Sequence, residues 1–411
     1  MKVLIVGGGA REHALCRSLL LDDDVDRLIC APGNAGIAEI AETHPLDVGD
    51  PAAIADLATG LAVDLVVIGP EVPLVAGAAD AVRERNIVCF GPSTAAAQLE
   101  GSKAFAKEVM AAASVPTAMA HVCDTAAEVT AALDAFGPPY VVKDDGLAAG
   151  KGVVVTDDRD EAIAHAAACG RVVVEEYLDG PEVSLFCVSD GTVVVPLEPA
   201  QDFKRVGDAD TGPNTGGMGA YSPLPWAPTD LVDSVVSQVA QPTVDHLRQM
   251  GTPFVGLLYV GLALSSRGLR VIEFNARFGD PETQVVLARL QSPLSTLLYG
   301  AAVGRLDEVG ALRWSEDAAV TVVVAAAGYP ESPQTGDIIK GIDAANAQEG
   351  AYVLHAGTRR DNDDVVSAGG RVLSVVGTGV DVAQARGSAY QAVRQISLSG
   401  SHYRSDIAAK P

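Results

Sequence analysis

Glycines and lysines are combined at residues 141–155, VVKDDGLAAGKGVVV, in a pattern that suits phosphate binding. Lys143 belongs to the first apolar run, and Lys151 lies in the following loop, flanked by Gly150 and Gly152. Glycine lets the backbone approach phosphate oxygens closely, and lysine neutralises their charge. An apolar run follows the loop, where a P-loop would continue into a helix. We therefore predict a phosphate-binding β-hairpin; a plain hairpin with surface lysines is the alternative.

A second chemical pattern is RVIEFNARFGDPETQ at residues 270–284. In a strand, Glu273 and Asn275 share one face because side chains alternate with a period of two. A carboxylate and an amide oxygen side by side suit Mg²⁺, which prefers oxygen ligands. Arg277 follows in the same register and could stabilise the charge of a transferring phosphoryl group. An ion pair between Glu273 and Arg277 at the strand end is the alternative.

Acidic residues end another apolar strand, in VVVEEYLDGPEVS at residues 172–184. Glu182 could accept hydrogen bonds from ribose hydroxyls. A solvated acidic strand end is the alternative. The backbone at four positions could bind the edge of an adenine: Glu175, Glu176, Tyr177 and Leu178.

A long polar segment, QDFKRVGDADTGPNTGGMGAYSP at residues 201–223, is too rich in glycine for a core. Asp202 and Lys204 precede a glycine-rich run that could wrap a small polar substrate. A disordered surface loop is the alternative, although long loops inside compact domains are often functional.

The chain opens with MKVLIVGGGAREHAL, in which an apolar run, a glycine turn and a helix start follow one another. Unpaired N–H groups at a helix start point at a bound anion, so this arrangement predicts an anion-binding turn. A dinucleotide-binding GxGxxG pattern needs glycine at position 12, where this chain has Glu12. The sequence therefore argues against a nicotinamide cofactor and favours a smaller ligand.

The elements that would position these residues alternate between strands and helices up to about residue 100. Buried apolar runs separated by amphipathic helical runs predict βαβ units and a parallel sheet. Turns at residues 7–9, 32–34 and 69–71 would follow strand ends and face one crevice. A hairpin is predicted at residues 257–275, and a mostly β domain with a closing helix is predicted after about residue 317.

The composition narrows the class of protein. With 53 acidic and 29 basic residues among 411, the formal charge is −24, which argues against nucleic acid and anionic membranes as partners. Six cysteines without a CxxC pair indicate reduced thiols in a cytoplasmic protein. No signal peptide or membrane span is predicted, and the seven histidines show no zinc-binding spacing.

Taken together, the motifs resemble the glycinamide ribonucleotide synthetase family, ATP-grasp ligases of purine biosynthesis. The resemblance covers almost the whole chain, and its motifs occur in family order. Two of them are specific to the family, DTGPNTGGMGAYSP and EFNARFGDPET. The others are VGGGAREHAL, APGNAG, VVIGPEVPLVAG, GPSTAAAQLEGSKAFAK, VVKDDGLAAGKGVVV, LHAGT and GGRVLSV.

The resemblance implies an α/β fold of three parts. An N-terminal parallel βαβ domain would span residues 1–101. A central ATP-grasp module would span residues 102–316, with a small α+β lid at about 116–180. A small, mostly β C-terminal domain would span residues 317–411.

The resemblance also implies roles for individual residues. Arg277 and Lys151 would be catalytic, and Glu273 and Asn275 would bind Mg²⁺ or Mn²⁺. ATP, the co-substrate, would be bound by Lys103, Lys143, Gly150, Lys151, Gly152, Glu175, Glu176, Tyr177, Leu178 and Glu182. Phosphoribosylamine would lie with its phosphate in the first glycine turn, contacting Gly9, Arg11, Glu12, Asn34, Pro70 and Glu71. Further substrate contacts would come from Asp202, Lys204, Gly216, Gly217, Met218, Gly279 and Asp280.

The implied reaction joins glycine to 5-phosphoribosylamine with cleavage of ATP to ADP and phosphate, through a glycyl phosphate. We expect small-molecule substrates only, and a monomer, with a dimer as the alternative. Three positions depart from the family pattern, with Asp144 in place of a small residue, Phe203 where histidine is common and Ala10 where glycine is usual. An ATP-grasp ligase for another substrate and a non-catalytic nucleotide-binding protein are the competing functions. The TGPNTGGMGAYS run argues against the first, and Lys143, Glu273, Asn275 and Arg277 argue against the second.

Overall fold

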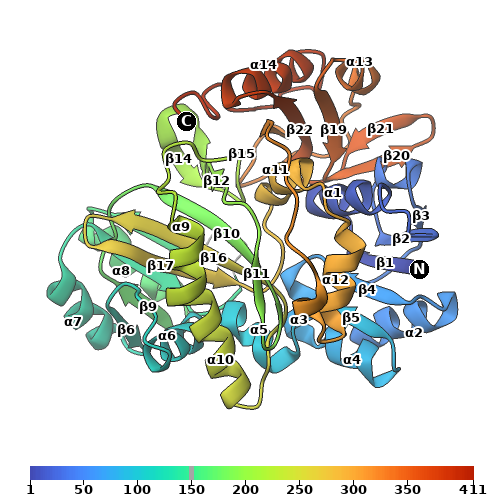
Figure 1. Cartoon of the computed structure of the whole chain (residues 1–411). Helices are drawn as coiled ribbons and strands as arrows, with labels where there is room; N and C mark the ends of the chain where they lie inside the picture. Colours follow the sequence, from blue (N-terminus) through green and yellow to red (C-terminus); the bar gives the residue numbers. More distant parts are fainter. Residues whose placement is uncertain (148–151) are drawn as a thin grey trace.

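Five parallel strands form the N-terminal sheet of the computed structural model, which describes residues 1–147 and 152–411 (Figure 1). Strands β1 and β4 are apolar and almost fully buried, because helices cover both faces of the sheet. The predicted parallel βαβ architecture is confirmed. In spatial order the strands are β3 (Glu42–Thr43), β2 (Arg27–Pro32), β1 (Lys2–Gly7), β4 (Leu65–Ile68) and β5 (Val88–Phe90). The connections contain α1 (Ala10–Leu19), η1 (Ile37–Glu39), α2 (Pro51–Leu61), α3 (Glu71–Ala76) and α4 (Ala78–Glu84).

The strand order of this sheet reverses between β1 and β4. The chain first builds outwards through β2 and β3, and then returns to add β4 and β5 on the other side of β1. Ligands of open α/β sheets bind at such a reversal, outside the carboxyl ends of the strands. The turns at residues 7–9 and 69–71 follow β1 and β4, so they lie next to each other at this point.

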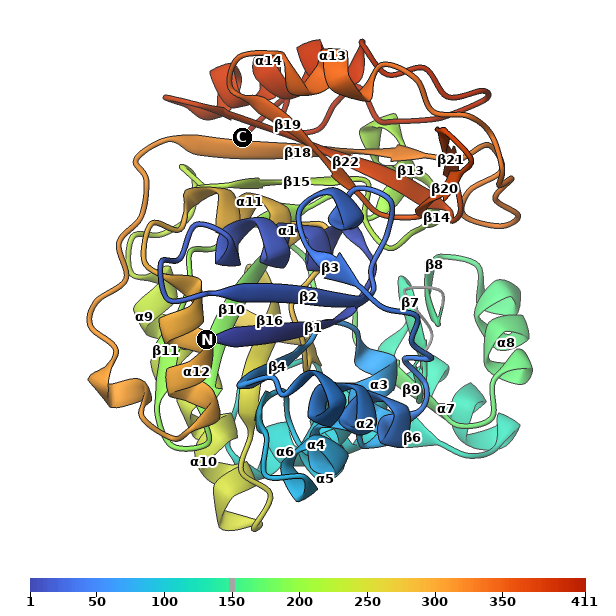
Figure 2. The same ribbon diagram turned by 90° about the vertical axis from the view of Figure 1, so that its right-hand side faces the viewer.

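A second, antiparallel sheet forms a small α+β unit with its own apolar core (Figure 2, right). We call this unit the lid. Its core contains Val142 and Val174 from the sheet and Leu133 from a covering helix. Its strands, in spatial order, are β6 (Ala120–Cys123), β9 (Val172–Glu175), β7 (Tyr140–Asp144) and β8 (Val153–Thr156), covered by α7 (Ala126–Phe136) and α8 (Arg159–Ala168).

A third, antiparallel sheet forms the larger half of the central region. The predicted hairpin of residues 257–275 is its β16–β17 pair, with a bulge opposite Gly261 and Leu262. The sheet has the order β11 (Val194–Pro196), β10 (Glu182–Asp190), β16 (Val255–Ser265) and β17 (Gly268–Asn275). Its helices are α5 (Thr94–Gly101), α6 (Lys103–Ala112), α9 (Leu231–Val235), a π-helical turn (Val236–Ala240) and α10 (Gln241–Gln249).

The C-terminal sheet includes strands from the glycine-rich segment, which the sequence did not predict. β12 (Gln201–Asp202) and β15 (Gly219–Ser222) extend it in the order β12, β15, β18 (Ala318–Ala325), β22 (Arg371–Gly379) and β19 (Ala351–His355). Two hairpins project from this region, β13 (Arg205–Gly207) with β14 (Thr211–Asn214), and β20 (Thr358–Asp361) with β21 (Asp364–Ser367). The remaining helices are η2 (Asp208–Asp210), α11 (Glu282–Arg289), α12 (Leu294–Ala302), η4 (Leu306–Glu308), α13 (Ile342–Asn346) and α14 (Val382–Val393).

Contacts between distant segments bring the three regions together. Helix α1 packs on α11, which follows the EFNARFGDP motif, and on β19 of the C-terminal sheet (Figure 2). The carboxyl end of β17 therefore lies beside the first glycine turn. Among the described residues, no helix combines the length and the apolar character that crossing a membrane requires.

Candidate active site

The first glycine turn is filled by a side chain of the protein itself. The N–H of Gly9 donates to one oxygen of Glu12 at 2.6 Å, and Nε of Arg11 donates to the other oxygen at 2.6 Å. Glu12 is buried, and a Cβ added to Gly69 would lie 2.1 Å from its Oε1. The interior of the turn therefore holds a carboxylate, and a bound anion has to lie outside it.

The predicted substrate residue Asn34 has its side-chain amide engaged by the protein. Its Nδ2 donates to the carbonyls of Gly8 at 2.9 Å and His355 at 2.8 Å. Its Oδ1 accepts hydrogen bonds from the N–H groups of Gly36 and Ile37. All hydrogen-bonding positions of the amide are used. Asn34 therefore joins the glycine turn to strand β19 of the C-terminal sheet.

Arg277 lies where the N-terminal crevice meets strand β17. Its Nε is 3.2 Å from a Glu71 oxygen, and its Nη2 is 3.0 Å from a Glu100 oxygen. Nη2 also lies 3.5 Å from Oδ1 of Asn275. Burial lowers the pKa of the Arg277 guanidinium, but Glu100 and Glu71 outweigh it and raise the pKa above its usual value. The alternative of a strand-end ion pair with Glu273 is wrong, because two carboxylates from other elements hold the arginine.

Glu100, at the end of α5, was not predicted as a site residue. Its second oxygen accepts the N–H of Ala276 at 2.7 Å. One carboxylate therefore fixes both the backbone before Arg277 and its guanidinium. The signal was present in the family motif GPSTAAAQLEGSKAFAK, but nothing local distinguishes this glutamate from a solvated one.

Glu273 and Asn275, the residues predicted to bind a metal, lie on one face of β17 as strand alternation predicts. Burial alone would raise the pKa of Glu273. Nearby lysines outweigh burial and hold this pKa below its usual value: Lys204, Lys143 and Lys103. Among the described residues, no group of three His, Cys, Asp or Glu side chains could hold a metal. A carboxylate and an amide oxygen fit a cation that takes its other ligands from phosphates and water, as Mg²⁺ does.

The lysines that were predicted to bind ATP are held by partners within the protein. Nζ of Lys143 lies 2.7 Å from Glu175 and donates to the carbonyl of Ile272 at 2.9 Å. Lys107, not predicted, also pairs with Glu175, at 2.8 Å. Nζ of Lys103 donates to the carbonyl of Gly146 at 2.9 Å. The side chain of Glu175 is thus a counter-ion for two lysines, so only its backbone is free for the adenine contact predicted from the sequence.

Residues 176–181 connect the lid sheet to the larger sheet without regular structure. The carboxylate of Glu176 accepts the N–H of Met119 at 3.0 Å and pairs with Arg267 at 2.9 Å. Tyr177 is exposed and Leu178 is half-buried. Gly152 begins the strand side of the glycine loop, and its carbonyl accepts the N–H of Asp144. Gly150 and Lys151 lie outside the described residues.

Asp202 and Lys204 are half-buried beside a polar cluster near strand β17. Lys204 pairs with Glu182, and burial raises the pKa of Asp202 to about 7 despite the opposing charge of Lys204. Tyr259 and Ser184 both donate hydrogen bonds to Glu282 in this cluster, at 2.8 and 3.1 Å. The predicted glycine-rich loop is therefore ordered against the site, and its disordered alternative is wrong.

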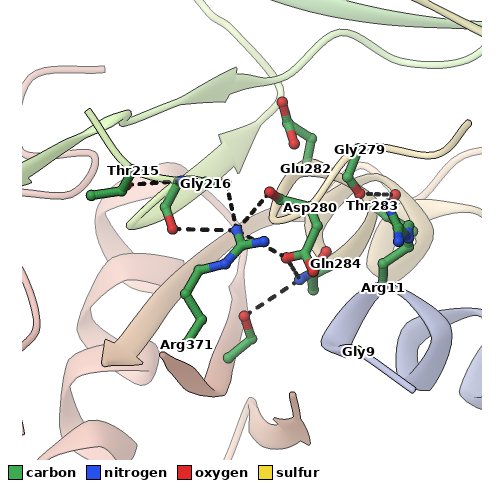
Figure 3. A network of polar contacts seen from close by, with 12 residues as sticks. Gly9, Arg11, Thr215, Gly216, Gly279, Asp280, Glu282, Thr283, Gln284 and Arg371 are labelled. Atoms are coloured by element: carbon green, nitrogen blue, oxygen red, sulfur yellow. Dashed lines mark hydrogen bonds and ion pairs between the residues drawn. The ribbon is translucent and has the colours of Figure 1, made fainter. Parts of the chain in front are cut away.

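Arg371, on the C-terminal sheet, was missed as a site residue although it belongs to the GGRVLSV motif. Its Nη1 donates to the carbonyls of Gly216, Gly217 and Asp280, and lies 3.4 Å from Oδ1 of Asp280 (Figure 3). Its other two nitrogens make no hydrogen bond within the described part of the chain. Gln284 donates to Asp280 at 2.8 Å. Burial alone would raise the pKa of Asp280, but Arg371 lowers it below its usual value.

A lysine-bearing lid sheet lies beside a second antiparallel sheet whose last strand carries the side-chain oxygens of Glu273 and Asn275. Together with the N-terminal βαβ domain, this arrangement defines an ATP-grasp enzyme. Three models of the phosphoribosylglycinamide synthetase family match the chain: the N domain at residues 1–100, the ATP-grasp (A) domain at residues 101–283 and the C domain at residues 319–410.

The relatives agree with the family models. Phosphoribosylamine–glycine ligase of Streptomyces coelicolor is 69% identical over 412 residues, covering 100% of this chain and 99% of that protein. The Mycobacterium tuberculosis protein of that name is 60% identical over 417 residues, covering 99% and 97%. A crystal structure of the Thermotoga maritima ligase matches with a TM-score of 0.85 and 32% identity, covering 99% and 100%. The chain belongs to the phosphoribosylglycinamide synthetase family, as its motifs predicted.

Proposed function

We propose that this protein joins glycine to 5-phosphoribosylamine with ATP, forming glycinamide ribonucleotide, ADP and phosphate. The observation that carries the proposal is the position of Arg277. It contacts Glu71 at the N-terminal crevice and Asn275 on the metal-binding strand. An acyl phosphate formed at the strand and an amine held in the crevice would therefore meet at this guanidinium.

The nucleotide side of the proposed site lies between the lid and the larger sheet. Lys103 and Lys143, with the glycine loop, would neutralise ATP phosphates, and the backbone of residues 175–178 would bind adenine. Mg²⁺ is the proposed cation, with Mn²⁺ as a substitute, and Glu273 and Asn275 would hold it. Its chemical contribution is to neutralise phosphate oxygens during transfer.

The sugar phosphate is proposed to lie across the outside of the glycine turn. Glu12 occupies the interior, so the phosphate of phosphoribosylamine would be repelled there. Arg371 would supply positive charge on the outer side, through the two nitrogens that make no hydrogen bond within the described residues, and Asp280 beside it can accept a ribose hydroxyl. Arg11 is buried, with Nε on Glu12 and Nη1 on the carbonyl of Phe278. This placement modifies the expectation that the turn itself holds the phosphate.

The reaction would proceed in two steps. An oxygen of the glycine carboxylate attacks the γ-phosphorus of ATP, and the bond to the ADP oxygen breaks. The amine of phosphoribosylamine then attacks the carbonyl carbon of glycyl phosphate, loses a proton and expels phosphate. Arg277 would stabilise charge on the transferred phosphoryl oxygens in both steps. The lid would exclude water, which would otherwise hydrolyse the acyl phosphate.

We propose that the monomer is the active form, with a dimer as the alternative. Sedimentation at working enzyme concentration tests this. An assembly whose dissociation removes activity would contradict it.

The function is tested by phosphate release from ATP with Mg²⁺, using glycine and freshly prepared phosphoribosylamine, with each omitted in turn. We expect release that requires both substrates, and a product with the mass of glycinamide ribonucleotide. Release with another carboxylate in place of glycine would point to a different ATP-grasp ligase. ATP binding without release under any pairing would indicate a non-catalytic protein.

A further inference from the structure

Arg404 lies near the end of the chain, whose last residue is Pro411. Its side chain is completely buried although it carries a charge. Its Nε and Nη2 donate to the carboxylate of Asp406 at 2.8 and 2.7 Å. Its Nη1 donates to Asp210 at 2.7 Å and to the carbonyl of Arg205 at 3.1 Å. Both of these partners belong to the β13–β14 hairpin of the glycine-rich loop. A buried guanidinium with this many bonds fixes its partners in one geometry.

The guanidinium also lies over the ring of Phe203, with its central carbon 5.0 Å from the ring centroid. Phe203 stands between Asp202 and Lys204 in an extended segment. Its N–H donates to Gly219, and its carbonyl accepts from Met218. Side chains alternate along such a segment, so the ring faces Arg404 while the two neighbouring side chains face Glu182 and the metal-binding strand.

Other bonds extend this contact along the C-terminal segment of residues 402–406. Ser405 donates its N–H to Asp208, Asp406 accepts the N–H of Ala209, and a ring nitrogen of His402 bonds the carbonyl of Val206 at 2.6 Å. Figure 1 shows the C-terminus close to β14. The loop that carries Asp202 and Lys204 is therefore braced by the last residues of the chain.

We propose that Arg404 is a positioning residue for the ligation reaction, acting through Phe203 to hold Asp202 and Lys204 in register with Glu273. The inference rests on the proposed function, in which the acyl phosphate forms at β17. Asp202 and Lys204 interact electrostatically with Glu273 of that strand, so the substrate that they contact would be glycine. The face of the phenylalanine ring attracts the guanidinium, which holds Phe203 against Arg404.

The test compares Arg404→Met, Arg404→Lys and Phe203→Leu with a matched control, Arg289→Lys. Arg289 is also buried, and it bonds to carbonyl oxygens, to Ser222 and to Glu198. No hydrogen bond or ion pair among the described residues joins it to the loop of residues 203–218. For each variant the kcat, the KM for glycine, the Kd for ATP and the Tm are measured. Hydrogen exchange of the loop amides is followed without substrates.

For Arg404→Met we expect the KM for glycine to rise about tenfold or more, with the Kd for ATP within about twofold of the parent. Arg404→Lys keeps the charge and should restore part of the glycine affinity. Phe203→Leu keeps an apolar side chain and should raise the KM less. Arg289→Lys should lower the Tm without changing the KM for glycine. The amides of Thr215 and Met218 should exchange faster only in the Arg404 and Phe203 variants.

The inference is overturned if the Arg404 and Phe203 variants lower the Tm as Arg289→Lys does but leave the KM for glycine and the loop amides unchanged. If Arg404→Met does not fold, Phe203→Leu decides by the same two measurements. Failure of the proposed function looks different, because the parent protein would then show no glycine-dependent phosphate release. In that case, unchanged hydrogen exchange of the loop amides in the Arg404 and Phe203 variants would still refute the role of Arg404 in holding the loop.

Discussion

Two glycine-rich segments border the site, and they are held in different ways. The turn at residues 7–9 is held from within the N-terminal domain, by hydrogen bonds with the side chains of Glu12 and Asn34. Gly69, which has no side chain, leaves room for Glu12. The loop at residues 203–218 is held by side chains that lie more than 100 positions away, Tyr329, Arg371 and Arg404.

The difference distinguishes a glycine motif whose shape depends on nearby residues from one whose shape depends on distant segments of the chain. In the turn, one carboxylate three residues ahead satisfies the freed N–H, so a short sequence specifies its shape. In the loop, successive carbonyls are satisfied by donors from the C-terminal sheet and the C-terminal segment. The loop can therefore form only after distant parts of the chain have packed, and substitutions far from the site should affect it.

The largest loss of stability and activity is expected from a substitution that fills the space next to Glu12, the carboxylate inside the turn at residues 7–9. Gly69→Ala would place a Cβ 2.1 Å from the buried Glu12 oxygen, which has no room to move. We expect a loss of about 3 kcal/mol in the free energy of unfolding and loss of detectable ligation. Urea denaturation measures the first. The control is Gly60→Ala in α2, where nothing lies within 4 Å, and this change should be neutral or stabilising. A stable, active Gly69→Ala protein would contradict the rigid turn.

Removing the distant anchor of the loop should have the next largest effect. Arg371→Met leaves the carbonyls of Gly216 and Asp280 without their donor and removes positive charge from the outside of the turn. We expect the KM for phosphoribosylamine to rise about 30-fold, equivalent to about 2 kcal/mol. Inhibition by ribose 5-phosphate and by ribose is measured in the parent and the variant, and the difference between the two sugars reports the contribution of the phosphate charge. Unchanged discrimination between these two sugars would refute a phosphate contact at Arg371.

Arg277 lies between the N-terminal crevice and strand β17, and the ion pairs that hold it can be weakened without replacing the arginine itself. Glu100→Gln keeps the shape and the bond from Ala276 but removes the charge that fixes the guanidinium. We expect kcat to fall about tenfold with little change in the KM for ATP. Glu198→Gln, which removes the partner of the remote Arg289, is the matched control and should leave kcat intact. A rise in the KM for ATP alone would argue that Glu100 serves nucleotide binding.

The smallest effect concerns the contact of α1 with the C-terminal sheet. Burial, His355 and Arg17 lower the pKa of His13 to about 3, and burial and Arg360 lower that of His355 to about 4. Both histidines are neutral in the folded protein, whereas the unfolded chain binds protons below about pH 6.5. Stability is therefore full above that pH and falls as the pH drops towards 4.

His13→Asn removes one of these titrations, because an amide oxygen can accept the N–H of His355 that Nδ1 now accepts at 2.9 Å. The variant should lose less stability between pH 7.5 and 5, by about 0.8 kcal/mol at pH 6 for one histidine. Urea denaturation at several pH values measures this, with His246→Asn on α10 as the control. Parallel pH profiles of the parent and His13→Asn would contradict the assignment.

Much of the fold followed from the sequence because its signals were short-range. The apolar strands, the β16–β17 hairpin and the common face of Glu273 and Asn275 depend on alternation within a few residues. Lys143 was likewise placed on a strand beside the glycine loop. The assignment of β12 and β15 to the C-terminal sheet was not predicted, because pairing with β18 joins segments about 100 residues apart.

The sequence by itself determined which residue types could bind phosphate and metal, and which local element carries each of them. Only the tertiary structure decided their partners. Arg277 bonds Glu71 and Glu100 rather than its neighbour Glu273, and Glu12 fills the turn that appeared open. The physical reason is that burying a charge demands a partner at hydrogen-bond distance, and packing of distant segments determines which carboxylate that is.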